Sequence, residues 1–267
     1  MPDLASTYIA LGTSAFLAGL MNSIAGGGTL LTFPALFAAL PGMASVANAT
    51  STIALMPGSL AGAWGYRKEL KDSRRFVVRM LAPSFLGGLI GSLLLVFFPE
   101  HFRTLVPWLI LTAATLFLVQ QPISKLLKKK QVVMPTEPGP GMIAVLIGFQ
   151  FLVAVYGGYF GAGIGILMLT SLGFMGVGDI HHMNAVKTFL ASVINAVSVV
   201  VFIIGDLIHW EYAAVMAVAA IAGGYTGARV ARRLPAAYVR WAVVIIAFSL
   251  AVYYFVQQYN TNGPGTA

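Results

Sequence analysis

The sequence contains no cysteine and few charged residues. Only 9% of its 267 residues are Asp, Glu, Lys or Arg, whereas a soluble domain carries about 25%. The absence of cysteine excludes disulfides, thiolate chemistry and cysteine-ligated clusters. No basic residue precedes the first apolar run, in "MPDLASTYIA", so we expect that run to be retained and not removed as a signal peptide. With a hydrophobic fraction of 58%, these absences predict an all-α polytopic membrane protein.

Acidic residues are missing from every long apolar run. A spanning helix needs about 20 apolar residues. Runs of that kind lie at 5–24, 44–65, 77–98, 104–121, 141–160, 181–204, 212–228 and 241–258. All eight Asp and Glu residues fall outside these runs. Ionisable groups inside membranes mark proton and ion pathways, so the absence of intramembrane carboxylates disfavours a cation as substrate.

Basic residues form three clusters, at 67–79, 125–130 and 229–240, which hold fourteen of the sixteen Lys and Arg residues. Cytoplasmic loops carry such clusters. All three clusters lie in the cytoplasm if each of the two glycine-broken segments folds as a hairpin, which returns the chain to the membrane face where the hairpin starts. In this arrangement both termini lie outside. The net charge of +8 is thus explained by topology. Membrane lipid is the expected partner, and nucleic acid is not.

Glycines interrupt two apolar runs. One break is "NSIAGGGTLLTFP" at 22–34, and the other is "FGAGIGI" at 160–166. Each glycine costs a helix interior about 1 kcal/mol, so neither run is predicted to be one continuous helix. A backbone break inside a bilayer is tolerated where it lines a cavity, and the amides that open the following short helix favour an anion. A third glycine-rich stretch, "FLGGLIGSL", is expected only to allow close packing of helices through Gly87, Gly88 and Gly91.

The second half of the chain repeats the first at an offset of about 135 residues. "VANATSTIAL" (46–55) corresponds to "HMNAVKTFLA" (182–191), and each follows a glycine break. This predicts an inverted-topology repeat of 4+4 units, in which each half has a glycine-broken helix and re-entrant short helix, then three spanning helices. The expected parts are a first repeat at 1–121, a cytoplasmic linker at 122–140 and an inverted second repeat at 141–267. Such repeats place a substrate site near the midplane, at discontinuous helices.

A polar stripe follows each break. Asn184, Lys187 and Asn195 share one helix face, and Asn48 and Ser51 hold the matching places in the first half. A lysine at the centre of a spanning helix costs about 2.5–3.5 kcal/mol and is read as functional; the alternative is that its stem snorkels to the headgroups. The asparagines either bind substrate or join helices.

The predicted substrate-binding residues combine the two breaks with the two stripes. They are Asn22, Gly26, Gly27, Gly28, Thr29, Asn48, Ser51, Thr52, Gly161, Gly163, Asn184, Lys187 and Asn195. Neither a metal site nor a cofactor is expected, since a metal would need several convergent ligands. The sequence assigns no role to His181 or His182.

The residues around both breaks resemble a known family. "NSIAGGGTLLTFPAL" followed by "ANATSTIAL", and "GGYFGAGIGILML" followed by "MNAVKTFLASVINAVSVVVF", are similar to the sulfite exporter TauE/SafE family, and the resemblance covers nearly the whole chain. It implies a multi-pass permease of a prokaryotic inner membrane, associated with sulfite export or organosulfonate movement. The positions that match the family motifs are Asn22, Gly26, Gly27, Gly28, Asn48, Gly161, Gly163, Asn184 and Lys187.

The predicted function is therefore a secondary transporter that exports a small sulfur oxyanion such as sulfite, or a small organosulfonate, across a bacterial or archaeal inner membrane. Two alternatives remain: an anion channel with the same site, and a permease for another small anion such as a carboxylate or thiosulfate. An enzyme is not expected, because the apolar runs hold no nucleophile–base pair. The sequence is compatible with a homodimer.

Overall fold

The computed structural model describes residues 4–24, 27–131, 139–177, 180–230 and 236–262, and within these ranges it is helical and contains no strand. The helices are α1 (Leu4–Ile24), α2 (Thr29–Ala39), α3 (Ala44–Gly65), α4 (Arg67–Asp72), α5 (Arg74–Phe97), α6 (Pro99–Gln131), α7 (Pro140–Tyr159), α8 (Ile164–Phe174), α9 (Ile180–Ile204), α10 (Trp210–Val230) and α11 (Ala236–Asn262). The predicted all-α class is confirmed.

Both glycine breaks separate a long helix from a short one. α1 is followed by α2 and α7 is followed by α8, and each short helix has 11 residues. Two details differ from the sequence-based prediction. The short helix α4 was not foreseen in the first basic cluster. α6 extends over 33 residues. It begins at Pro99, which suits the first position of a helix, and it continues past residue 121 into the segment predicted as a linker.

Five helices within the described residues are long and apolar enough to cross a membrane: α1, α5, α6, α7 and α9. α3 has 22 residues and is long enough to cross a membrane, but it is less apolar than these five helices. Its polar side chains face other helices and are buried there, among them Ser45, Asn48 and Ser51. A helix that carries a polar, protein-facing stripe scores lower in hydropathy than one that meets lipid on all sides.

Two helix pairs are packed at very short range. α1 lies along α10 and α5 lies along α7. A Cβ added to Gly19 or Gly223 would strike the backbone of the opposite helix in the first pair, and one added to Gly87 or Gly91 would do the same in the second. The prediction that the glycines of "FLGGLIGSL" allow close packing is therefore confirmed, and Gly88 contributes by lying directly against α7.

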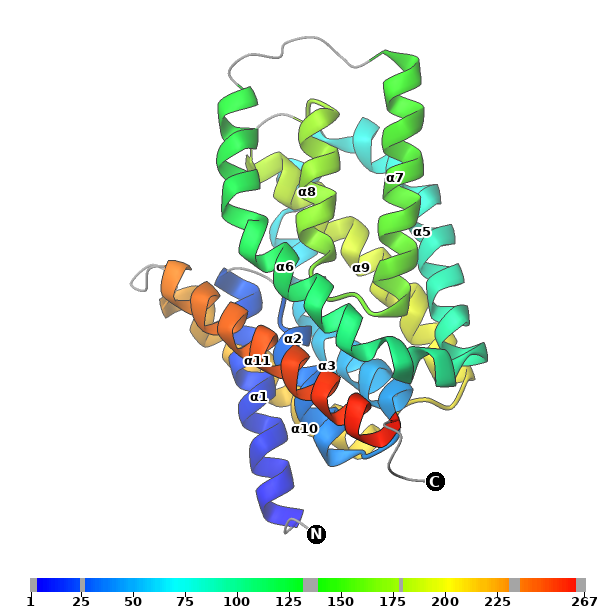
Figure 1. Cartoon of the computed structure of the whole chain (residues 1–267). Coiled ribbons are helices and arrows are strands. Elements are labelled where there is room, and N and C mark those ends of the chain that lie inside the picture. The colour runs from blue at the N-terminus through cyan, green and yellow to red at the C-terminus, as the bar shows by residue number, and fades with distance from the viewer. Residues whose placement is uncertain (1–3, 25–26, 132–138, 178–179, 231–235, 263–267) are drawn as a thin grey trace.

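The arrangement places both breaks inside the molecule. In Figure 1 the start of α1 and the end of α11 lie at one end of the structure, and the end of α6 and the start of α7 lie at the other. α1 and α7 enter from these opposite ends and stop near the middle, and α2 and α8 then turn back. α3 crosses α9, and α6 packs against α11.

Candidate functional site

The first break is closed by a side-chain amide and an aromatic ring. Gly27 has φ +87°, a left-handed conformation that glycine adopts without a steric penalty. The Gly28 N–H donates to Asn22 Oδ1 at 2.7 Å. A Cβ on Gly27 would overlap the ring of Phe117 on α6. Asn22 thus holds the backbone in this state, while Gly26 lies outside the described residues and Thr29 begins α2 in a partly buried position.

The second break is built from two left-handed glycines. Gly161 and Gly163 have φ +80° and +82°, so a side chain at either position would be strained. The Tyr156 hydroxyl donates to the Ala162 carbonyl at 2.8 Å, which fixes the loop between these glycines. α8 then begins with the Ile166 N–H donating to the Gly163 carbonyl.

One helix supports both breaks. Phe117 of α6 lies against Gly27, and Leu116, one residue earlier, lies against Gly163, where an added Cβ would be 3.3 Å from Leu116 Cδ1. Phe117 is only 1% exposed. The sequence did not predict this role of α6, because Leu116 and Phe117 are ordinary apolar residues and the segment around them has no glycine.

The first polar stripe ties α3 to both halves of the chain. Ser51 Oγ lies 2.6 Å from Thr32 Oγ1 in the first turn of α2. Asn48 Nδ2 donates to the carbonyl of Tyr159, the last residue of α7, at 3.1 Å. The Thr52 hydroxyl donates to the backbone carbonyl of Asn48 at 2.9 Å. Asn48 and Ser51 are therefore placed at the breaks, whereas Thr52 is bound to its own helix.

The second polar stripe carries the charge. Lys187 Nζ donates to Asn184 Oδ1 at 2.8 Å. The lysine stem lies against the first turn of α8, where a Cβ on Gly165 would be 3.2 Å from Lys187 Cδ. No carboxylate pairs with Lys187 within the described ranges. Its ammonium is thus held by a neutral amide beside the start of a short helix.

The two stripes form two clusters in this structure. α3 crosses α9 where Ser192 Oγ donates to the Ser59 carbonyl at 3.1 Å. Ser59 lies eleven residues beyond Asn48, or about 16 Å along the helix. Of the predicted partners, only Asn184 is hydrogen-bonded to Lys187 in the described part of the chain; Asn195 is partly buried about two turns further along α9.

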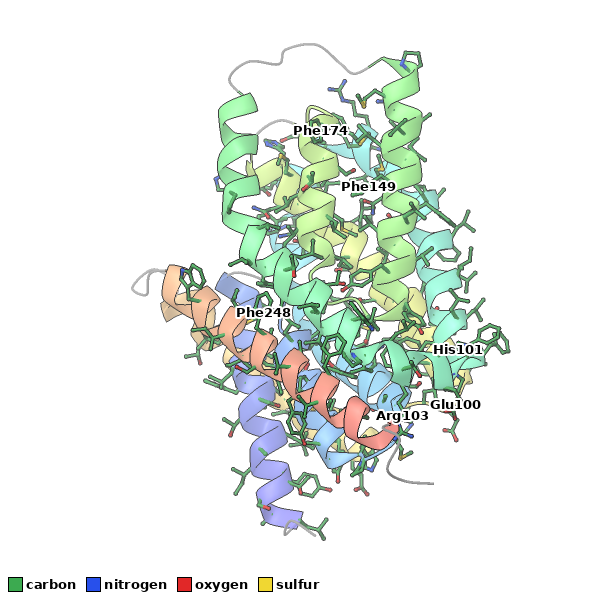
Figure 2. All side chains as sticks on the ribbon, in the orientation of Figure 1. Glu100, His101, Arg103, Phe149, Phe174 and Phe248 are labelled. Atoms are coloured by element: carbon green, nitrogen blue, oxygen red, sulfur yellow. The ribbon has the colours of Figure 1, made fainter. Side chains whose placement is uncertain are left out.

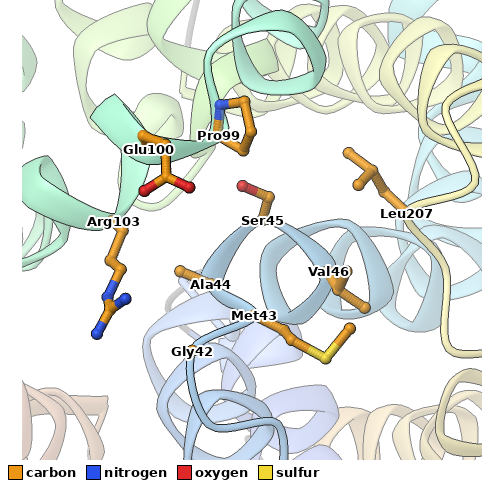
Figure 3. Close-up of a pocket in the computed structure, with 9 residues that line it drawn as sticks. All are labelled: Gly42, Met43, Ala44, Ser45, Val46, Pro99, Glu100, Arg103 and Leu207. Atoms are coloured by element: carbon orange, nitrogen blue, oxygen red, sulfur yellow. The ribbon is translucent and has the colours of Figure 1, made fainter.

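A cavity of about 160 Å³ lies beside the start of α3 (Figure 3). The Glu100 carboxylate faces the Ser45 hydroxyl across it, and the Arg103 guanidinium points away. Figure 2 shows Glu100 and Arg103 at the end of the molecule where the termini lie. Arg103 lies in the second turn of α6. The residues that line the cavity are Gly42, Met43, Ala44, Ser45, Val46, Pro99, Glu100, Arg103 and Leu207.

An aromatic cluster lies on the inner side of that helix end. Phe102, between Pro99 and Arg103, is fully buried. Its ring centroid is 5.2 Å from that of Tyr159 and 6.2 Å from those of Phe33 and Phe160. Because Phe33 belongs to α2 and Phe160 follows α7, the cluster joins the short helix of the first half to the break of the second.

At the opposite end of the molecule, His182 Nε2 lies 3.9 Å from an Asp72 carboxylate oxygen. This contact joins α9 to α4. Asp72 is 75% exposed, and exposed ion pairs of this kind contribute about 0–1 kcal/mol. The contact gives His182 a partner on α4 and does not make it part of the candidate substrate site.

Comparison with known proteins adds a family and several relatives. The family model described as "Sulfite exporter TauE/SafE" matches residues 11–254. A probable membrane transporter protein of Haemophilus influenzae is 28% identical over 88% of this chain and 89% of its own length. The corresponding values are 26%, 94% and 94% for the probable membrane transporter protein ORF9 of a Sinorhizobium species, and 29%, 87% and 84% for the probable membrane transporter protein YfcA of Escherichia coli K12. No solved structure matches the chain significantly.

Proposed function

The chain belongs to the sulfite exporter TauE/SafE family, and from this premise we propose that it is a secondary transporter that exports a small sulfur oxyanion such as sulfite, or a small organosulfonate, across a bacterial inner membrane. Membership of the family and the names of the relatives support a multi-pass membrane permease. The choice of an anion rests on the chemistry of the second break.

The single observation that carries the proposal is the environment of Lys187. Its ammonium is bonded to the neutral Asn184 amide, and its stem contacts the first turn of α8. A cation inside a membrane protein costs free energy unless it is paired. An anion placed between this ammonium and the positive end of the α8 dipole would supply the missing counter-charge. A cation would be repelled by both.

The helix pairing supports an inverted repeat as the machinery of transport. α1 corresponds to α7 in the proposed repeat and α10 corresponds to α5, so the α1–α10 and α5–α7 pairs are equivalent contacts. We assign both termini to the periplasmic side and the basic clusters to the cytoplasm. Rocking of one repeat against the other would then expose the breaks to each side in turn.

Export of an anion needs no coupling ion. An inside-negative potential supplies about 2.3 kcal/mol per charge per 100 mV. A divalent anion therefore gains about 4–5 kcal/mol on leaving the cell at that potential. Uniport is sufficient for export, whereas uptake would need a coupled ion or a steep gradient.

The test is anion efflux from proteoliposomes under an imposed inside-negative potential. The sulfite export rate of wild type should saturate as the sulfite concentration rises. The export rate of Lys187→Met should be at least about tenfold lower than that of wild type. Lys71→Met, in exposed α4, is the matched control and should transport like wild type. Wild-type rates in Lys187→Met would contradict the site. A flux that rises linearly with sulfite would favour a channel, and stronger competition by a carboxylate or thiosulfate would favour a permease for that anion.

A further inference from the structure

We propose that the side-chain oxygen of Asn48 accepts a hydrogen bond from the transported anion, so that the site selects an anion that carries a donor: a hydroxyl, an ammonium or an acid proton. This inference rests on the proposed function and narrows its substrate class. It comes from an unfilled acceptor beside the second break.

The orientation of the Asn48 amide is fixed by its partner. Nδ2 donates to the Tyr159 carbonyl at 3.1 Å. A backbone carbonyl only accepts hydrogen bonds, so the NH₂ end of the amide must face it. The Oδ1 end consequently faces the other way and presents two lone pairs.

That oxygen is buried and accepts no hydrogen bond in the part of the chain that the structure describes. Asn48 is 1% exposed. Buried polar atoms are rarely left unpaired in native proteins, and each exception calls for an explanation such as a missing ligand or water.

The neighbouring hydroxyls are already committed elsewhere. Thr32 Oγ1 lies 3.3 Å from the Gly28 carbonyl and 2.6 Å from Ser51 Oγ, a contact in which either hydroxyl can be the donor. The Thr52 hydroxyl donates to the Asn48 backbone carbonyl. None of these three hydroxyls is hydrogen-bonded to Asn48 Oδ1 in the structure.

The position of Asn48 fits a ligand-binding role. Tyr159 ends α7 just before the second break, and Ser51, one turn from Asn48, bonds to α2 just after the first. One turn in the other direction, Ser45 lines the cavity at the start of α3. Asn48 therefore lies on a continuous polar face that leads from the cavity to both breaks.

The chemistry of an acceptor-only atom sets the selectivity. A deprotonated oxyanion without a donor would bring its own lone pairs against Oδ1 and gain nothing there. A sulfonate with a hydroxyl or amino group, or a protonated sulfite, would donate to Oδ1 while its charge is balanced elsewhere. The helix starts beside the breaks would recognise the charge at this point, and Asn48 would recognise the proton; Lys187, in the other cluster, would meet the anion at a separate point.

A second orphan amide provides a matched control. Gln150 Nε2 donates to Ser84 Oγ at 2.9 Å, and Gln150 Oε1 is buried without a partner in the described residues. This pair lies in the α5–α7 contact and not at a break. If any buried amide oxygen without a partner could produce the preference for an anion that carries a donor, Gln150 would contribute to that preference as well.

The experiment compares 2-hydroxyethanesulfonate with ethanesulfonate, which share a sulfonate group and differ by one hydroxyl. Binding to the purified protein is measured by calorimetry at constant pH. Wild type should bind the hydroxylated anion about fivefold more tightly, since one neutral hydrogen bond is gained. Asn48→Leu should abolish the difference between the two anions, and Gln150→Leu should preserve it.

Each result decides between the hypotheses. Equal affinities in wild type would overturn the inference while leaving the proposed permease intact, and this comparison needs no variant that has to fold. A difference that persists in Asn48→Leu would also overturn it. If wild type binds neither sulfonate but is stabilised by sulfite, the organosulfonate arm of the proposed function falls. The inference then requires that Asn48→Leu lose the stabilisation by protonated sulfite, and a variant stabilised like wild type would overturn it.

Discussion

The two glycine breaks use the same backbone device and surround it with different chemistry. At the first, Asn22 bonds to the Gly28 amide and Phe117 covers Gly27, and the nearest α3 contact is the neutral pair Thr32–Ser51. At the second, two left-handed glycines turn the chain, and Lys187 lies against the start of α8. Two similar backbone breaks therefore differ in charge: among the described residues, a lysine lies against the short helix of the second break, and a neutral hydroxyl pair lies at the first.

The two close helix pairs, α1–α10 and α5–α7, differ in one buried hydrogen bond. α5 and α7 share the buried hydrogen bond from Gln150 to Ser84. At the matching positions of α1 and α10, offset by 135 and 136 residues, stand Ala15 and Ala220, both buried. Close packing is common to both pairs, and the polar bond belongs to one.

The largest expected effect concerns the two ends of the molecule. Because the chain has no cysteine, single cysteines introduced at Ser6 and Lys71, which are both exposed, should react with an impermeant maleimide from opposite faces of the membrane: Ser6→Cys from the periplasm and Lys71→Cys only from the cytoplasm. Ser73 is a poor choice, since it is 2% exposed. Labelling of both cysteines from the same face would contradict the inverted topology.

The second prediction separates strain from overlap at the breaks. Gly163→Ala should destabilise the protein by about 1–3 kcal/mol, the cost of a left-handed non-glycine residue. Gly27→Ala should cost more, because its Cβ would also meet the Phe117 ring. The measurement is detergent-solubilised unfolding of each variant alone and combined with Phe117→Ala.

In the Phe117→Ala background, part of the Gly27→Ala cost should disappear and the Gly163→Ala cost should not, since only Gly27 faces that ring. Equal costs at both glycines in both backgrounds would show that Phe117 does not cover the first break. The sequence predicted that Gly27 contacts the substrate. The structure places an aromatic ring there.

These outcomes show what the sequence could predict. The long helices and both breaks follow from apolar runs and glycines, which are local signals. The hydrogen bond from Asn48 to Tyr159 joins residues 111 positions apart, and no periodicity encodes such a partner. The support that α6 gives to both breaks was equally hidden, because Leu116 and Phe117 look like any apolar helix residues.

The third prediction compares the matching positions Lys187 and Ser51. Lys187→Arg should bind the anion about tenfold more weakly than wild type, because the planar guanidinium cannot take the place of a compact ammonium beside Gly165. Ser51→Ala removes a neutral hydrogen bond to Thr32 and should weaken binding no more than about threefold. Anion-dependent heat stabilisation measures both. A larger loss in Ser51→Ala than in Lys187→Arg would place the dominant binding contact in the first half.

The smallest expected effect comes from making α5–α7 resemble α1–α10. Gln150→Leu keeps the side-chain volume while it removes one hydrogen bond and one unpaired buried oxygen. Hydrogen bonds between membrane helices are worth about 0.6 kcal/mol on average, and loss of the orphan oxygen offsets that cost; the free energy of unfolding should therefore change by less than about 1 kcal/mol. Gln150→Ala with Ser84→Ala copies the alanines of the other pair but leaves a cavity, and should cost about 1–2 kcal/mol more than Gln150→Leu. If Gln150→Leu alone is strongly destabilising, the hydrogen bond to Ser84 stabilises the α5–α7 pair by a contact that the α1–α10 pair lacks. The two pairs would then differ in stability, as the two breaks differ in charge.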